Sequence, residues 1–215
     1  MIIREYYQTE DFTCGPSALL TGMGALNPSI ILSKEEEFLI WHESNSIFMG
    51  ETGHPGCGIY GLALSAMKRG FSAKISLNLQ GDNTLFLDWV TKGFRRDIYI
   101  WNEQRFHRLF LEAGGKEDFS PISILDIMIV LERGGIVIGL ISDSVYEQNS
   151  GHWITIESMN REKTVYFDPY PEETISGKRV VLTDDFLNKL MCYGAKKKKA
   201  CLYIYYPCLC AGNIK

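Results

Sequence analysis

The hydrophobic pattern of the sequence changes at Gly135, and this change limits the folds that the chain can adopt. Before it, apolar residues recur at helical spacing, as in segment 14–25. After it, 136–142 is a short apolar run, and 152–160 and 164–170 alternate apolar and polar residues on either side of a short polar turn. This segregation predicts an α+β fold, in which a helical N-terminal half packs on an antiparallel C-terminal sheet.

Local signals predict the other elements. Ser33 begins a capping box with Glu36 at its third position, which marks the start of a helix. Gly70 follows an apolar helical segment and suits a helix C-cap. The sequence contains no internal repeat and no clear linker, so we expect one domain spanning 1–215. We expect further helices at 62–70, 84–93, 102–115, 122–135 and 183–191, and further strands at 71–79 and 200–207.

Charge and hydropathy argue against two classes of partner. The 215 residues carry a formal net charge of −4, whereas nucleic-acid binding needs a basic face. The basic run 196–199 precedes an apolar segment and is typical of a solvated turn. No apolar run approaches the ~20 residues that a membrane helix needs, and the N-terminus lacks the apolar region of a signal peptide. We therefore expect a cytoplasmic protein with no nucleic-acid or membrane partner.

The cysteines do not show the paired spacing of a metal site. The pair Cys208 and Cys210 is one residue short of the CxxC spacing that zinc favours. His54 and Cys57 lie in a glycine-rich loop, but two ligands do not make a zinc site. We expect reduced thiols, no metal and no cofactor. The six cysteines are Cys14, Cys57, Cys192, Cys201, Cys208 and Cys210.

Cys14 stands where an apolar helix begins, in the stretch "QTEDFTCGPSALL". Pro16 fits the first turn of this helix, because its missing N–H costs nothing there. A thiol in this position can be a small packing residue or a nucleophile. The partial positive charge of a helix N-terminus favours a thiolate, and a nearby imidazolium favours it further. A catalytic reading therefore requires a histidine from elsewhere in the fold.

His152 is the histidine that best meets this need. It opens the strand "GHWITIE", where a side chain is firmly held yet accessible, and Gly151 leaves space beside its ring. Asp168 lies at the end of the next predicted strand, in "YFDPY". If the two strands are antiparallel, Asp168 comes close to His152 and can orient the imidazole, whose other nitrogen faces Cys14.

Gln8 completes the candidate site as a donor to an oxyanion. Attack on an amide carbonyl creates a negative oxygen, which the Gln8 side chain and the Cys14 backbone N–H could stabilise together. Each feature also has a structural reading: Cys-Gly-Pro and Asp-Pro occur in ordinary turns, and a His-Trp pair on a strand is often packing. Their combination in the order Gln–Cys–His–Asp favours the catalytic interpretation.

The motif around Cys14 resembles the Q-x-x-D-x-x-C-G-P motif of the C39-like peptidases, a family of the papain-like clan. "GHWITI" and "YFDPY" are similar to its histidine and aspartate motifs, and "GHPGCGIYGLALSAMKRGFSAKI" resembles a segment of one subfamily that is often fused to an acetyltransferase. The resemblance implies a papain-like fold with Cys14 as nucleophile, His152 as base, Asp168 as its orienting acid and Gln8 as oxyanion donor. It does not identify the substrate.

These observations predict a cysteine peptidase or amidase that acts on a peptide or protein. Two alternatives use the same fold: an acyltransferase, in which an amine replaces water, and a binding module without catalysis. We further predict that four residues near the nucleophile and base contact substrate, namely His54, Cys57, Gly151 and Trp153.

Overall fold

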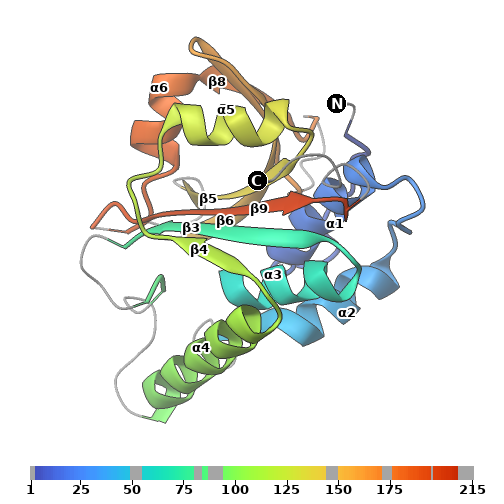
Figure 1. Cartoon of the computed structure of the whole chain (residues 1–215), viewed down its shortest axis with the longest axis vertical. Helices are drawn as coiled ribbons and strands as arrows, with labels where there is room; N and C mark the ends of the chain where they lie inside the picture. The colour runs from blue at the N-terminus through green and yellow to red at the C-terminus, as the bar shows by residue number, and fades with distance from the viewer. Residues whose placement is uncertain are drawn as a thin grey trace.

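A seven-stranded sheet in the order β4-β3-β9-β5-β6-β7-β8 forms the centre of the protein (Figure 1). The computed structural model describes residues 3–48, 55–79, 84–86, 94–143, 150–170, 176–194 and 196–207. The pair β3 and β4 is parallel, and the other neighbouring strands are antiparallel. The strands of this sheet are β3 (Ser72–Asn78), β4 (Lys116–Asp118), β5 (Ile136–Asp143), β6 (Ser150–Met159), β7 (Lys163–Phe167), β8 (Lys178–Leu182) and β9 (Lys199–Tyr205).

Helices cover both faces of the sheet. One apolar core joins α1 and α3 to one face, and a second joins α5 and the π-helical turn η1 to the other. Figure 1 shows α5 and α6 on one side, with α2, α3 and α4 on the other. The helices are α1 (Cys14–Leu26), α2 (Lys34–Ser44), α3 (Ile59–Lys68), α4 (Phe94–Glu112), α5 (Ile124–Glu132), α6 (Thr183–Asp185) and η1 (Phe186–Leu190).

The helix that begins at Cys14 is the central one. Its residues from Gly15 to Gly24 are all buried, and it packs against β5 and β6. Gly22 permits this close approach, because an added Cβ would lie 2.7 Å from Cγ2 of Ile136 on β5. The sheet therefore holds α1 along its whole length, which fixes the position of Cys14 at its start.

The structure confirms the α+β prediction and most of the expected elements. α1, α3 and α5 lie where the helical patterns place them, and Gly70 ends the α3 region with a φ of +84°. Ser33 caps α2 by accepting a hydrogen bond from the backbone N–H of Glu36. The four strands predicted from alternation and apolar runs in the second half correspond to β5, β6, β7 and β9.

Three expectations need correction. The sheet is not confined to the C-terminal half, because β3 pairs with β9 and brings the short strand β4 with it. A two-stranded sheet of β1 (Asn45–Phe48) and β2 (Pro55–Cys57) was not predicted, and neither was β8. A helix was expected at 84–93, but residues 84–86 are not helical and 87–93 lie outside the described residues.

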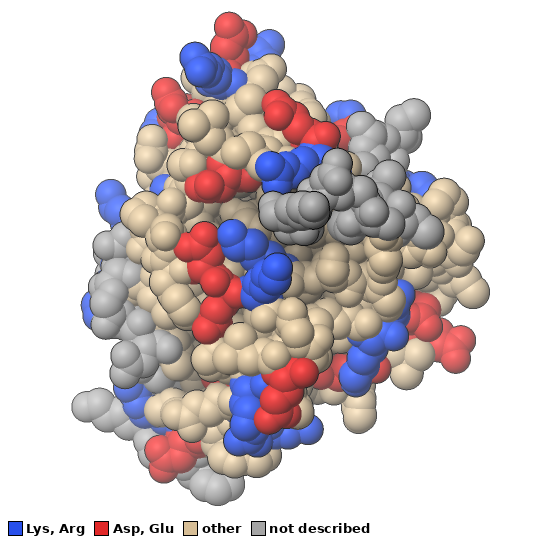
Figure 2. Space-filling model, viewed as in Figure 1, with Lys and Arg blue, Asp and Glu red and all other residues tan. Residues whose placement is uncertain are grey.

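Charged side chains are spread over the face of the protein drawn in Figure 2. On the face drawn in Figure 2, basic and acidic groups lie interspersed, with several close pairs. Among the helices that the structure describes, none is both long and apolar enough to cross a lipid bilayer.

Candidate active site

Cys14 is the first residue of α1, as the sequence predicts, and its side chain is half-buried. In the described part of the chain, no side chain caps this helix. The residue before it, Thr13, donates its hydroxyl to the Glu10 carbonyl instead, at 2.8 Å. The backbone N–H groups in the first turn of α1 are therefore not neutralised by a capping side chain. Their partial positive charge at the helix start favours an anion near Cys14.

His152 and Asp168 meet at one end of the β6–β7 pair. His152 is the third residue of β6, and Asp168 follows the last residue of β7. Because Thr155 pairs with Phe167 across the two antiparallel strands, the two side chains come to the same end of the sheet. Nε2 of His152 lies 2.7 Å from Oδ1 of Asp168.

The carboxylate of Asp168 is itself held in place. The backbone N–H of Tyr170 donates to the same Oδ1 atom at 2.9 Å. Burial would raise the pKa of Asp168, but the hydrogen bond and charge of His152, together with the Tyr170 amide, lower it. Asp168 is therefore ionised at neutral pH, and its bond to Nε2 leaves the Nδ1 side of the ring for another partner.

Cys14 lies close enough to this ring to change its pKa. The imidazole is 8% exposed, and burial alone would lower its pKa. Hydrogen bonds with Asp168 and Cys14, and the negative charges of both groups, instead raise the pKa of His152 from 6.5 to about 10. A raised pKa of this size favours the imidazolium form of His152 at neutral pH.

The charge on His152 gives a prediction that can be measured without a substrate. We expect the His152 ring to stay protonated through pH 8. In the Cys14→Ser variant we expect the ring to titrate at lower pH, because the contribution of Cys14 to its raised pKa is removed. Ring chemical shifts in an NMR titration measure both pKa values, with exposed His42 as the internal control. If His152 titrates near 6.5 in both proteins, the ion pair with Cys14 does not exist.

The raised pKa of His152 also determines how the stability of the fold depends on pH. The folded pKa of His152 lies above its unfolded value, so its contribution is fully present below about pH 6.5 and disappears as pH rises toward 10. Asp168 has a lowered pKa, so its contribution is present above its unfolded value of 3.8 and disappears in acid. The pair therefore stabilises the fold most between these two limits.

Gln8 lies beside this pair and is 4% exposed. Its backbone N–H donates to the carbonyl of Pro169, the residue after Asp168, at 2.8 Å. Its side-chain Nε2 donates to the Glu10 carbonyl at 2.9 Å, which is the same carbonyl that accepts the Thr13 hydroxyl just before Cys14. An amide nitrogen carries two hydrogens, so one remains for a ligand. Within the described structure, Gln8 Oε1 is buried and has no hydrogen-bond partner.

A buried hydrogen bond joins the helix that begins at Cys14 to the strand that carries His152. The Thr155 hydroxyl on β6 donates to the carbonyl of Ala18 on α1 at 2.8 Å. Ala18 lies one helical turn after Cys14, and Thr155 lies three residues after His152. This bond fixes how far α1 can slide along β6. Sequence reasoning missed Thr155, because one threonine in a strand gives no sign of such a contact.

Comparison of the sequence with known protein families identifies the family of this chain. A family model described as "Peptidase_C39 like family" matches residues 4–205. The chain belongs to this family. The matched range contains Gln8, Cys14, His152 and Asp168, and its C39-like description agrees with the resemblance read from the sequence motifs.

Other comparisons add less. No curated protein matches the chain. Among solved structures, the peptidase domain of Streptococcus ComA, a bi-functional ABC transporter involved in a quorum sensing pathway, has a TM-score of 0.46 and 12% identity. That match covers 94% of this chain and 96% of the other chain. Similarity at this level supports no conclusion about function.

Two of the predicted substrate-binding residues of this C39-like chain lie in its core. Cys57 and Trp153 are 3% and 2% exposed, so the prediction that they contact substrate is corrected to a supporting role. Trp153 Nε1 donates to the Cys57 carbonyl at 3.1 Å, and an added Cβ on Gly15 would lie 3.1–3.3 Å from atoms of both residues. They pack beneath the start of α1 and support it from below.

Burial also separates the two cysteines near the site. Burial and the charge of Cys14 raise the pKa of the Cys57 thiol far above its usual value, although a hydrogen bond from Ser44 at 3.1 Å opposes the shift. Cys57 is thus a protonated, inert thiol at neutral pH, unlike a nucleophile. The other two predicted substrate contacts differ from each other: Gly151 is partly exposed beside His152, and His54 lies outside the described residues.

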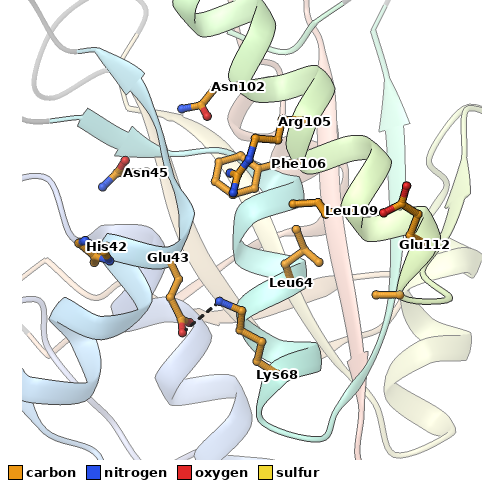
Figure 3. A pocket seen from close by; sticks show the side chains of 11 residues that line it. His42, Glu43, Asn45, Leu64, Lys68, Asn102, Arg105, Phe106, Leu109 and Glu112 are labelled. Atoms are coloured by element: carbon orange, nitrogen blue, oxygen red, sulfur yellow. Dashed lines mark ion pairs between the residues drawn. The ribbon is translucent and has the colours of Figure 1, made fainter.

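A groove lies between α2, α3 and α4 (Figure 3). Leu64, Phe106 and Leu109 give it apolar walls. The ion pair between Lys68 and Glu43, 3.3 Å long, crosses its lower part. None of the predicted catalytic side chains lines this groove, so it is not the place of the proposed chemistry.

Proposed function

We propose that this C39-like chain is a cysteine peptidase or amidase. The observation that carries the proposal is the buried His152 ring, which contacts Asp168 at 2.7 Å and whose pKa is raised both by that carboxylate and by Cys14 at the start of α1. This is the arrangement that a nucleophile, a base and an orienting group require. A non-catalytic module has no need to keep a buried histidine between an ionised carboxylate and a cysteine at a helix start.

Each residue has a role in the proposed cycle. The Cys14 thiolate attacks the carbonyl carbon of a peptide or amide bond, and the electron pair of the C=O bond moves to the oxygen. His152 then gives its proton to the leaving nitrogen, the C–N bond breaks and a thioester remains on Cys14. Water, losing a proton to His152, attacks the thioester and releases the acid. Asp168 holds the ring in orientation throughout.

The direct test is covalent and does not need the natural substrate. A library of peptide chloromethyl ketones should alkylate Cys14, with loss of chloride and formation of a stable thioether, and mass spectrometry of tryptic peptides identifies the site. Turnover of a fluorogenic peptide or amide library then gives the reaction class, and products made with and without an added amine distinguish hydrolysis from acyl transfer. Labelling at Cys57, or none at Cys14, would contradict the proposal.

Gln8 is proposed to stabilise the oxyanion together with the Cys14 backbone N–H. Since this contact forms only in the transition state, Gln8→Ala should lower kcat by about a hundredfold or more and leave KM nearly unchanged. Iodoacetamide labelling of Cys14 at pH 6 should stay near the wild-type rate, because the Cys14–His152 pair is intact. Gln104→Ala, at an exposed position on α4, is the matched control. Full activity in Gln8→Ala would remove Gln8 from the site.

A further inference from the structure

A buried glutamate gathers the segments that carry Gln8 and Cys14. Glu37, on α2, is 0% exposed. Its Oε1 accepts hydrogen bonds from the Thr9 backbone N–H at 2.9 Å and from the Ser17 hydroxyl at 3.1 Å. Its Oε2 accepts from the Tyr6 hydroxyl at 2.9 Å and from the Thr9 hydroxyl at 2.8 Å. All four donors are uncharged.

The positions of these donors relate Glu37 to the proposed chemistry. Tyr6 and Thr9 flank Gln8 in the chain, and Ser17 lies in the first turn of α1, three residues after Cys14. The Glu37 carboxylate therefore binds the chain before and after Gln8. It also binds the first turn of α1, which begins with the backbone N–H of Cys14. These are the two donors proposed for the oxyanion.

We propose that Glu37 is a positioning residue, which holds the Gln8 side chain and the Cys14 backbone N–H in the relative orientation that an oxyanion hole requires. This inference rests on the proposed peptidase or amidase function. Glu37 acts through Gln8 and α1 and does not contact the substrate.

The chemistry of the cluster explains why an ionised carboxylate suits this position. A carboxylate offers two oxygens and accepts only, so it can satisfy four donors at once. Burying a charge is costly unless hydrogen bonds compensate for it. Here the four donors do so, and the N-terminus of α2 adds a favourable field, because Glu37 lies in the first turn of that helix. Burial and the bond to Glu37 also raise the pKa of Tyr6, so its hydroxyl remains a donor.

Glu37→Gln is the first test variant. The amide leaves one accepting oxygen and directs an NH₂ group at two donors, so at least two of the four bonds are lost while the shape is kept. We expect kcat to fall by about tenfold or more, with KM within about threefold of wild type. Hydrogen exchange at the Thr9 amide should be faster, while Cys14 labelling at pH 6 stays near wild type. Glu35→Gln, exposed in the same turn of α2, is the matched control.

A pair of surface variants keeps the test decisive if Glu37→Gln is unstable. Thr9 is exposed, so it can be changed without opening the core. Thr9→Val removes the hydroxyl that binds Glu37, whereas Thr9→Ser keeps it. We expect Thr9→Val to lose several-fold in kcat and to lower the melting temperature modestly, because one of the four bonds to the buried carboxylate is lost. Thr9→Ser should keep the wild-type value of both.

Three outcomes would overturn the proposal. The first is wild-type kcat in both Glu37→Gln and Thr9→Val, in a protein whose turnover depends on Cys14. The second is an equal loss in Thr9→Val and Thr9→Ser. The third is that Glu37→Gln lowers kcat, the rate of Cys14 labelling and the melting temperature together, while Thr9→Val keeps wild-type activity. That result would mean that Glu37 only stabilises the fold. Failure of the proposed function gives a different result: no Cys14-dependent turnover in the wild-type protein.

Discussion

Replacing Cys14 with alanine is expected to abolish turnover, with a loss of about 10⁴-fold or more, because no other group in the site can form the thioester. The fold should change little in stability, since the thiol is half-buried and α1 is held by its buried residues from Gly15 to Gly24. Product formation from the best library substrate and the melting temperature measure these two effects. Iodoacetamide labelling at pH 6 should also disappear at this position.

Cys57→Ala is the informative comparison, because it removes the neighbouring thiol. Cys57 packs under the start of α1 and accepts a hydrogen bond from Ser44, so this change should lower stability. Turnover should remain, because the Cys57 thiol is protonated and enclosed. Loss of turnover in Cys57→Ala together with full turnover in Cys14→Ala would mean that the wrong cysteine is assigned.

Asp168→Asn should have the second largest effect. The amide keeps the shape of the side chain but removes the negative charge that helps to hold His152 protonated and oriented. A turnover loss of about 10³–10⁴-fold is expected, as for other triads that lose this carboxylate. Unlike the Gln8 and Glu37 variants, it should also slow Cys14 labelling at pH 6 and lower the pKa of His152.

Asp184→Asn is the matched control for this change, since Asp184 is exposed on α6. If Asp168→Asn retains both wild-type turnover and the His152 titration, the 2.7 Å contact has no role in catalysis. If turnover falls but the titration does not move, Asp168 orients the ring without setting its charge.

The sequence predicts the positions of Cys14, His152 and Asp168, because local sequence patterns determine where each of them lies in its helix or strand. Cys14 stands where a proline and an apolar stripe mark the start of a helix, and α1 begins there. His152 and Asp168 lie on alternating segments joined by a short turn, and this arrangement determines which ends of the strands meet. Their approach therefore follows from antiparallel pairing, without knowledge of the rest of the fold.

Contacts between distant segments could not be predicted in this way. The pairing of β3 with β9 joins residues more than a hundred positions apart, and no local pattern gives that register. Glu37 is one of three successive glutamates, and only the packing of α2 against the N-terminal segment decides which of them is buried. Trp153 was expected in the cleft because it follows His152, and Cys57 because it lies in a glycine-rich loop, but both side chains are buried in the core.

The bond between Thr155 and Ala18 has a consequence for how this site can change. Since it joins the helix of Cys14 to the strand of His152, and Gly22 is tightly packed on β5 further along the same helix, neither element can shift alone. A substitution that altered the distance between thiol and imidazole would have to move the central core. For the proposed peptidase or amidase, we therefore expect new substrate preferences to arise in the segments around the site and not from a change in the spacing of Cys14 and His152.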